Sequence, residues 1–226
     1  MVIMDYLEKN ARLHPSEVAL VEINPALRPD RTTWKEFELI EAGGGGQYRR
    51  EMTWKEFDEK ANRFANLLLS RGVKKGDKVA ILLMNCLEWL PIYFGVLKTG
   101  ALAVPMNYRY TSEEIDYCVK LSDASVLVFG PEFIGRIENI AEKLSGMRAM
   151  FYVGHDTPGF ADNYEEYTAF CSTHAPAIEL TENDDAAIYF SSGTTGFPKA
   201  ILHKHRALAS SCLTEQKPVR RSRSSV

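Results

Sequence analysis

The sequence predicts an α/β fold in which a largely parallel sheet is flanked by helices. Two observations lead to this prediction. From Thr53 onward, short apolar segments typical of strands alternate with segments of helical periodicity, and such alternation favours parallel strands joined by helices. In addition, residues 78–84 (KVAILLM) form an unbroken apolar run, which is typical of a strand that is buried on both faces of a sheet.

The N-terminal part is predicted to contain a helix, a strand and an insertion. Tyr6, Leu7, Ala11 and Leu13 have helical spacing, and the helix should end before Pro15. Residues 17–23 (EVALVEI) alternate like a strand. Residues 24–46 contain two prolines and four consecutive glycines, which predicts an exposed, mobile insertion.

A regular series of elements follows this insertion. Thr53 is predicted to cap a helix and to form a capping box with Glu56, and Arg71 and Gly72 should end that helix. The expected strands are 78–84, 101–104, 125–129, 149–153 and 186–190, and the expected helices are 87–98, 112–121 and 132–144. Strand 186–190 is expected to be the last of the sheet, with an unpaired apolar edge that favours association with another chain.

Residues 156–185 are polar and are interpreted as a connection between strands. The acidic residues Glu182, Asp184 and Asp185 lie near its end. Clusters of this kind are more often solvated than metal-bound, so no metal site is predicted from them.

Composition restricts the class of protein. The chain has 226 residues, of which 45% are hydrophobic and 25% charged, as in ordinary globular proteins. A formal net charge of -3 gives no reason to expect nucleic acid as a partner, and no apolar run is long enough to predict a membrane span. Four widely spaced cysteines argue against a zinc site or a disulfide framework and favour a reducing, cytoplasmic compartment: Cys86, Cys118, Cys171 and Cys212.

The strongest local signal is residues 191–199 (SSGTTGFPK), which directly follow the strand at 186–190. Ligands of open α/β sheets bind at the carboxyl ends of strands. Glycines let the backbone approach a polyanion, hydroxyls donate to phosphate oxygens, and a lysine adds a positive charge. The spacing does not match the P-loop pattern, so the segment predicts phosphate binding by a different architecture.

Residues 189–199 closely resemble the signature loop of the AMP-binding, adenylate-forming superfamily, which includes acyl-CoA synthetases and peptide-synthetase adenylation domains. Residues 53–69 (TWKEFDEKANRFANLLL) resemble the first conserved helix of that family, and residues 97–107 (LKTGALAVPMN) resemble its second conserved block. The resemblance extends over residues 1–208. It implies that the fold is an incomplete N-terminal domain of the adenylate-forming enzyme fold.

The resemblance implies an ATP-dependent acid–thiol ligase of the acyl-CoA synthetase type, with a role in fatty acid metabolism. In that family a carboxylate attacks ATP to give an acyl-adenylate and pyrophosphate, and coenzyme A then takes the acyl group. The expected partners are therefore a small-molecule carboxylic acid, ATP and CoA, and the expected cofactors are ATP, Mg²⁺ and CoA. Carried over to this chain, the ligands of the β- and γ-phosphates would be Ser191, Ser192, Gly193, Thr194, Thr195 and Gly196, together with Lys199 as the catalytic residue.

Three further residues of interest directly follow the loop. Ala200 stands where the family usually has glycine, which should be tolerated at negative φ with mild loosening of the loop. His203 and His205 are interpreted as ordinary surface or packing residues.

By the same resemblance, residues 1–210 correspond to the N-terminal part of the AMP-binding domain. Residues 211–226 are interpreted as a basic, Ser-rich tail, disordered or non-native. The metal-binding glutamate and the C-terminal lid domain of the family are expected to be absent from the chain.

Three hypotheses for the function therefore remain. The first is a ligase that is inactive as this chain alone, and the second is a non-catalytic fragment that binds triphosphate weakly. The third is a piece of a peptide-synthetase adenylation domain. The motifs specify neither the acid that is activated nor the oligomeric state.

Overall fold

The computed structural model describes residues 2–24, 48–191 and 198–215. In chain order the elements are α1 (Met4–Leu13), β1 (Val18–Ile23), β2 (Arg49–Thr53), α2 (Trp54–Ser70), β3 (Lys78–Leu82), α3 (Trp89–Lys98), β4 (Leu102–Pro105), α4 (Ser112–Ser122), β5 (Val126–Phe129), the 3₁₀ turn η2 (Pro131–Phe133), α5 (Ile134–Glu138), β6 (Ala149–Tyr152), β7 (Asp162–Asn163), α6 (Tyr164–Ala169), β8 (Asp185–Ser191), β9 (Lys199–Lys204) and α7 (His205–Glu215). The predicted insertion at 24–46, apart from Asn24, lies outside the described residues, as do residues 216–226 of the predicted tail. Residues 211–215, the first part of that tail, are helical and form the end of α7.

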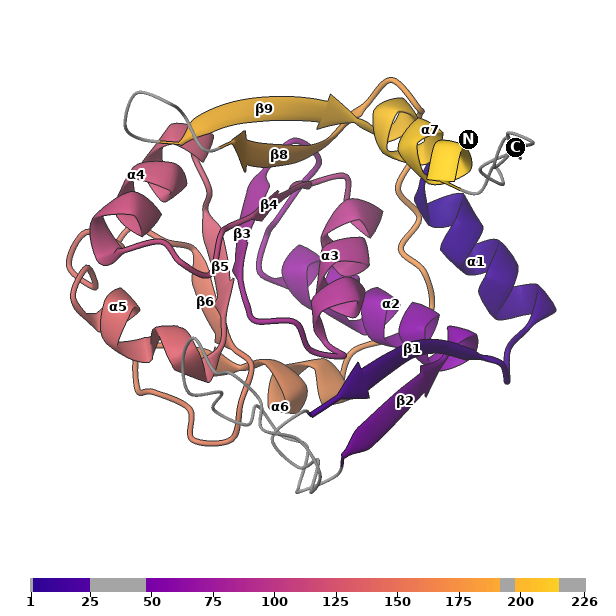
Figure 1. Ribbon diagram of the computed structural model, residues 1–226, viewed down its shortest axis with the longest axis horizontal. Helices are drawn as coiled ribbons and strands as arrows, with labels where there is room; N and C mark the ends of the chain where they lie inside the picture. The colour runs from indigo at the N-terminus through magenta and orange to yellow at the C-terminus, as the bar shows by residue number, and fades with distance from the viewer. Residues whose placement is uncertain (1, 25–47, 192–197, 216–226) are drawn as a thin grey trace, which may run out of the picture.

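The central sheet confirms the predicted fold class. Its strands lie in the order β7-β6-β5-β3-β4-β8-β9. Every neighbouring pair is parallel except β8 and β9, which are antiparallel. A separate antiparallel hairpin of β1 and β2 lies beside α2, at the lower right of Figure 1.

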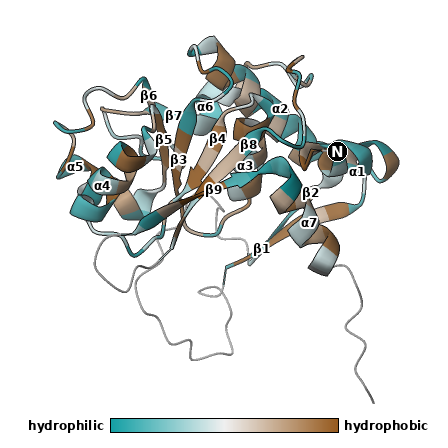
Figure 2. Cartoon of the chain, turned by 90° about the horizontal axis from the view of Figure 1, so that it is seen from above, coloured by the Kyte–Doolittle hydropathy of each residue, from teal (hydrophilic) through white to brown (hydrophobic). Residues whose placement is uncertain are grey.

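Helices cover both faces of this sheet. Successive residues of a strand point to opposite sides, so each central strand packs against both layers of helices. In β3, Val79 and Ile81 pack with α2 and α3, whereas Ala80 and Leu82 pack with α4 and α5. All four residues are fully buried. Figure 2 shows the hydrophobic strands enclosed between the helices. The unbroken apolar run thus corresponds to a strand with two buried faces, as predicted.

Helix α2 begins and ends as its sequence predicts. The Thr53 hydroxyl accepts a hydrogen bond from the Glu56 backbone N–H, and the Glu56 carboxylate accepts one from the Thr53 N–H at 2.8 Å. At the other end Arg71 is the C-cap and Gly72 has φ of 76°, a backbone conformation that favours glycine. Both signals are local, which is why the sequence alone identified them.

Two segments differ from the sequence-based expectation. The helix predicted at 132–144 is shorter, because η2 and the five-residue α5 are followed by turns. Residues 156–185 are more structured than predicted, since they contain β7 and α6. Asn163 caps α6 by accepting from the Glu166 N–H at 3.0 Å, and Tyr164 packs in the main core with an exposed fraction of 1%.

The largest correction concerns the sheet edge. Strand β8 was expected to leave an unpaired edge, but β9 pairs with it from Asp185 to Ser191. The edge strand on this side is therefore β9, whose Ile201 and Leu202 are exposed. The sequence analysis does not predict β9, because residues 199–204 (KAILHK) directly follow the loop signature and form a strand through their pairing with β8.

Within the described residues, no helix combines the length and apolar character needed to cross a membrane.

Candidate functional site

The predicted site lies at the carboxyl end of β8. This strand is parallel to β4, with Ala187 opposite Ala103. Its carboxyl end therefore lies at the same edge of the sheet as those of β3, β5 and β6. Ser191 is the last residue of β8, so the predicted phosphate loop begins at the edge where open α/β sheets bind ligands.

The structure places two of the seven predicted site residues. Ser191 and Lys199 are partners across the β8–β9 hairpin. The other five, Ser192, Gly193, Thr194, Thr195 and Gly196, lie outside the described residues. The two ends of the loop are thus held next to each other by a strand ladder.

Opposed residues of an antiparallel pair carry their side chains on the same face. The Ser191 hydroxyl and the Lys199 ammonium group therefore leave the hairpin on one side. Lys199 is exposed, and no carboxylate in the described part of the chain pairs with it. A donor hydroxyl and a positive charge at the two ends of one short loop suit an anionic ligand.

Ala200 also lies in β9, opposite Phe190. Among the described residues, Asp123 is the only non-glycine residue with positive φ. Ala200 thus occupies an ordinary extended conformation, as expected for a tolerated replacement of glycine.

An aromatic group that the sequence analysis did not single out supports the hairpin. The hydroxyl of Tyr189, two residues before the loop, lies 2.7 Å from that of Tyr93 on α3. Burial raises the pKa of both phenols, so both remain protonated and available for hydrogen bonding. The signal in the sequence was the alternation of Tyr189 with Ser191, which places both side chains on one face.

The two histidines after the loop have different environments. The His203 ring lies against that of Tyr189, with 4.9 Å between centroids. His205 begins α7 and has an exposed fraction of 0%. Neither of its ring nitrogens has a hydrogen-bond partner among the described residues, and burial lowers its pKa. His205 is therefore a packing residue, and its burial favours the neutral imidazole.

The acidic cluster before β8 has a structural role. Asp184 accepts from the Thr181 N–H at 2.7 Å and from Lys75 at 2.9 Å. The hydrogen bond from the Thr181 N–H, followed by that from Lys75, lowers the pKa of Asp184 to about 2. Asp185 pairs with Lys204 at 3.2 Å. In the described ranges, no group of three or more His, Cys, Asp or Glu side chains could hold a metal ion.

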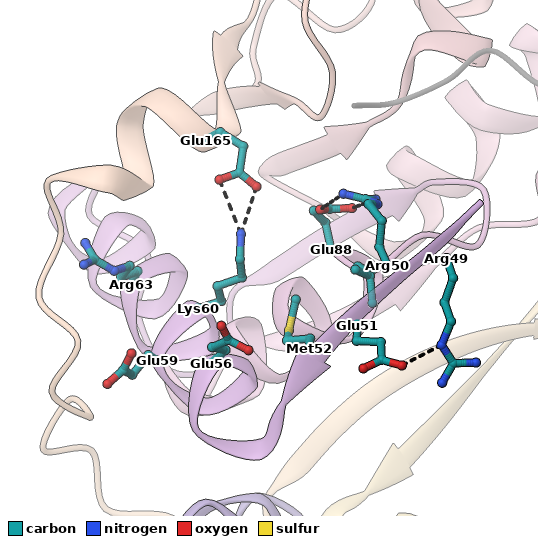
Figure 3. Close-up of a pocket in the computed structure, with 11 residues that line it drawn as sticks. Arg49, Arg50, Glu51, Met52, Glu56, Glu59, Lys60, Arg63, Glu88 and Glu165 are labelled. Carbon is teal, nitrogen blue, oxygen red and sulfur yellow. Dashed lines mark hydrogen bonds and ion pairs between the residues drawn. The ribbon is translucent and has the colours of Figure 1, made fainter. Parts of the chain in front are cut away.

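A pocket is also present outside the β8–β9 hairpin. This pocket of about 700 Å³ opens between β2, α2 and α6 and is lined by many charged side chains. Figure 3 shows that these charges face one another: Lys60 pairs with Glu165 at 3.0 Å, and Arg50 lies 3.4 Å from the buried Glu88. An anion would have to displace these partners, so this pocket suits a triphosphate less well than the hairpin does.

The sequence profile of the family described as AMP-binding enzyme matches residues 7–225. The long-chain-fatty-acid–CoA ligase FadD13 of Mycobacterium tuberculosis is 32% identical over 165 residues, which are 70% of this chain and 31% of that protein. The chain spans about three tenths of the length of the CoA ligases that it matches.

Two solved structures are similar in fold. One is the anthranilate CoA ligase AuaEII in complex with anthranoyl-AMP, with a TM-score of 0.79 and 26% identity over 94% of this chain and 36% of that chain. The other is ATP-bound MatB of Rhodopseudomonas palustris, with a TM-score of 0.63 and 31% identity over 73% of this chain and 32% of that chain.

Proposed function

The chain belongs to the family of AMP-binding enzymes, and on that premise we propose that its β8–β9 hairpin holds the phosphates of ATP in an acid–thiol ligase. Such an enzyme converts a carboxylate and ATP into an acyl-adenylate and pyrophosphate, and then transfers the acyl group to CoA. The observation that carries the proposal is the pairing of Ser191 with Lys199 at the carboxyl end of β8.

The proposed roles follow from the chemistry of the side chains. The Ser191 hydroxyl donates to a phosphate oxygen, as would the hydroxyls and backbone N–H groups of residues 192–196. The Lys199 ammonium group lies opposite and offsets negative charge that develops on the departing pyrophosphate. Positioning and charge compensation of this kind make up most of the catalysis of phosphoryl-type transfer.

Among the described residues, no three His, Cys, Asp or Glu side chains are grouped so that they could hold Mg²⁺. We propose that these 226 residues alone do not complete the reaction, because they span about three tenths of the relatives' length. The four cysteines are unpaired thiols, which supports a reducing, cytoplasmic location.

The nature of the acid is left open by the relatives themselves. One is a ligase of long-chain fatty acids, and a similar structure is a ligase of the aromatic acid anthranilate. We propose activation of an organic carboxylic acid and transfer to CoA, without a choice between these classes.

Binding of tripolyphosphate tests the proposed role of Lys199. In Lys199→Ala the affinity should fall about 3- to 10-fold, since one charge-assisted contact in an exposed loop is lost. Lys9→Ala is the matched control, because Lys9 is an exposed lysine on α1. Equal affinities of the wild type and both variants would show that the loop does not use this lysine.

A further inference from the structure

The loop end of β8 extends past the body of the sheet. Ala187 lies opposite Ala103 of β4, and β4 ends at Pro105. The two strands are parallel, so two residues further along each strand Pro105 lies beside Tyr189. Phe190 and Ser191 therefore extend beyond the end of β4. On the other side β9 continues as far as Lys199. The end of β8 that leads into the loop therefore has a strand neighbour on one side only.

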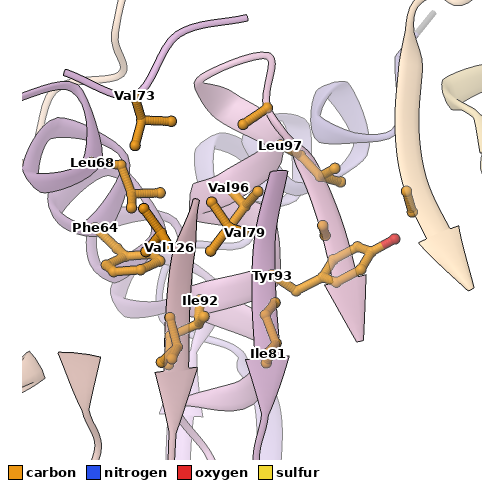
Figure 4. Close-up of a cluster of buried hydrophobic side chains, with 14 of the residues drawn as sticks. Phe64, Leu68, Val73, Val79, Ile81, Ile92, Tyr93, Val96, Leu97 and Val126 are labelled. Atoms are coloured by element: carbon orange, nitrogen blue, oxygen red, sulfur yellow. The ribbon is translucent and has the colours of Figure 1, made fainter. Parts of the chain in front are cut away.

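One side-chain hydrogen bond joins the residue directly before this projecting end to the helical layer. It joins the hydroxyls of Tyr189 and Tyr93 at 2.7 Å. Among the side-chain hydrogen bonds described for residues 188–191, no other leaves the hairpin. Tyr93 is 5% exposed, and Figure 4 shows its hydroxyl directed away from the apolar cluster, toward β8.

The phenol pair has a fixed geometry. The Trp89 ring stacks on Tyr93 with 5.4 Å between centroids and an interplanar angle of 12°. The His203 ring of β9 lies against Tyr189. Each phenol ring thus lies against a neighbouring ring, which orients the two hydroxyl groups toward each other, whichever of them is the donor.

This hydrogen bond acts on the face of the hairpin that carries the proposed ligands. Tyr189 and Ser191 are two residues apart in one strand and so share a face, and Lys199 lies opposite Ser191. Phe190 packs on the other side, against the α4 and α5 cluster. Apolar packing of this kind is non-directional, whereas a hydrogen bond has a preferred direction.

We propose that Tyr93 is a positioning residue for Ser191 and Lys199, the two described members of the phosphate site: through its hydroxyl bond to Tyr189 it sets the direction of the strand end that carries Ser191 and faces Lys199. The inference rests on the proposed function of the loop and assigns to α3 a role in it. Tyr93 touches no phosphate in this account and acts only through Tyr189.

Amide hydrogen exchange of the 226-residue chain tests the hydrogen bond itself. Tyr93→Phe keeps the ring and removes the hydroxyl, so exchange at Phe190, Ser191 and Ala200 should accelerate about 2- to 10-fold, the change expected for one lost hydrogen bond. Exchange in β3 and β5 should stay within twofold of the wild type. Unchanged rates near the loop, or an equal rise at all amides, would overturn the inference.

The functional part is tested with tripolyphosphate as the probe. Tyr93→Phe should weaken its binding about 2- to 5-fold, because the binding-competent orientation is less populated. Tyr189→Phe should have the same effect and the double variant no more than either, since the two hydroxyls act on each other. Tyr152→Phe is the matched control, because Tyr152 is a buried tyrosine on β6. Additive losses, or an equal loss in Tyr152→Phe, would contradict the proposal.

Failure of the proposed function would look different. If the wild type bound no tripolyphosphate, the function of the loop would be refuted, and with it the role of Tyr93 in positioning that loop. The exchange rates would still report whether the tyrosine pair holds the strand end. The two results therefore separate an error about the hydrogen bond from an error about the ligand.

Discussion

Gly95 permits the close contact between α3 and α2, and its replacement by alanine tests this packing. A Cβ atom at Gly95 would lie 2.9 Å from the carbonyl oxygen of Ala61 and 3.0 Å from the Phe64 ring. Ala61 and Phe64 belong to α2. Because the first obstacle is a backbone atom that cannot rotate away, the two helices would have to separate.

The expected magnitude follows from two opposing effects. Overpacking of a close-packed core costs about 1–3 kcal/mol, and the rigid carbonyl places Gly95→Ala near the upper limit. Alanine gains about 1 kcal/mol over glycine in a helix interior. The free energy of unfolding should therefore fall by about 2 kcal/mol.

Gly135 in α5 is the matched control, because a Cβ atom there would meet nothing within 4 Å. Gly135→Ala should keep the helix-propensity gain alone and stabilise the chain by up to about 1 kcal/mol. Urea unfolding followed by circular dichroism measures both variants. Equal stability of Gly95→Ala and Gly135→Ala would refute the packing argument.

Three further outcomes are expected. Burial lowers the pKa of His205 below its usual 6.5, so its contribution to stability is present above pH 6.5 and is lost as the pH falls through the folded-state pKa. Unfolding free energy should therefore drop more steeply from pH 7.5 to 5 in the wild type than in His205→Gln, and parallel profiles would contradict this. Light scattering should show concentration-dependent association through the β9 edge, reduced in Leu202→Lys because Leu202 is 54% exposed there; a wild-type monomer at all concentrations would argue against it. Finally, the chain should exchange labelled pyrophosphate into ATP no faster than Lys199→Ala with any acid of a panel, and clear turnover above that background would show that these residues suffice for adenylation.

The features predicted correctly from the sequence depend on local signals. The apolar run at 78–84 predicts that β3 is buried on both faces, and the Thr53–Glu56 capping box predicts where α2 begins. Both depend on residues within a few positions of each other. The family resemblance likewise came from short contiguous motifs, and the profile match over residues 7–225 confirms it.

The features missed depend on contacts between distant residues. Strand β9 is defined by its pairing with β8, and the short β7 by two pairs with β6. The hydrogen bond between Tyr93 and Tyr189 joins residues 96 positions apart in the sequence, so no local sequence pattern predicts it. The predicted helix at 132–144 was too long because apolar spacing alone does not show where turns replace helical hydrogen bonds.

The central claim is that the β8–β9 hairpin binds phosphate through its own loop. Titration of the isotope-labelled chain with ATP, GTP and tripolyphosphate, followed by NMR at the amides of Ser191, Gly193, Gly196 and Lys199, tests it most directly. The account predicts similar shifts for all three ligands and dissociation constants of about 1 mM, equivalent to about -4 kcal/mol, because the contacts come from the loop and not from a base site. Absence of shifts at these amides, or a strong preference for ATP, would contradict it.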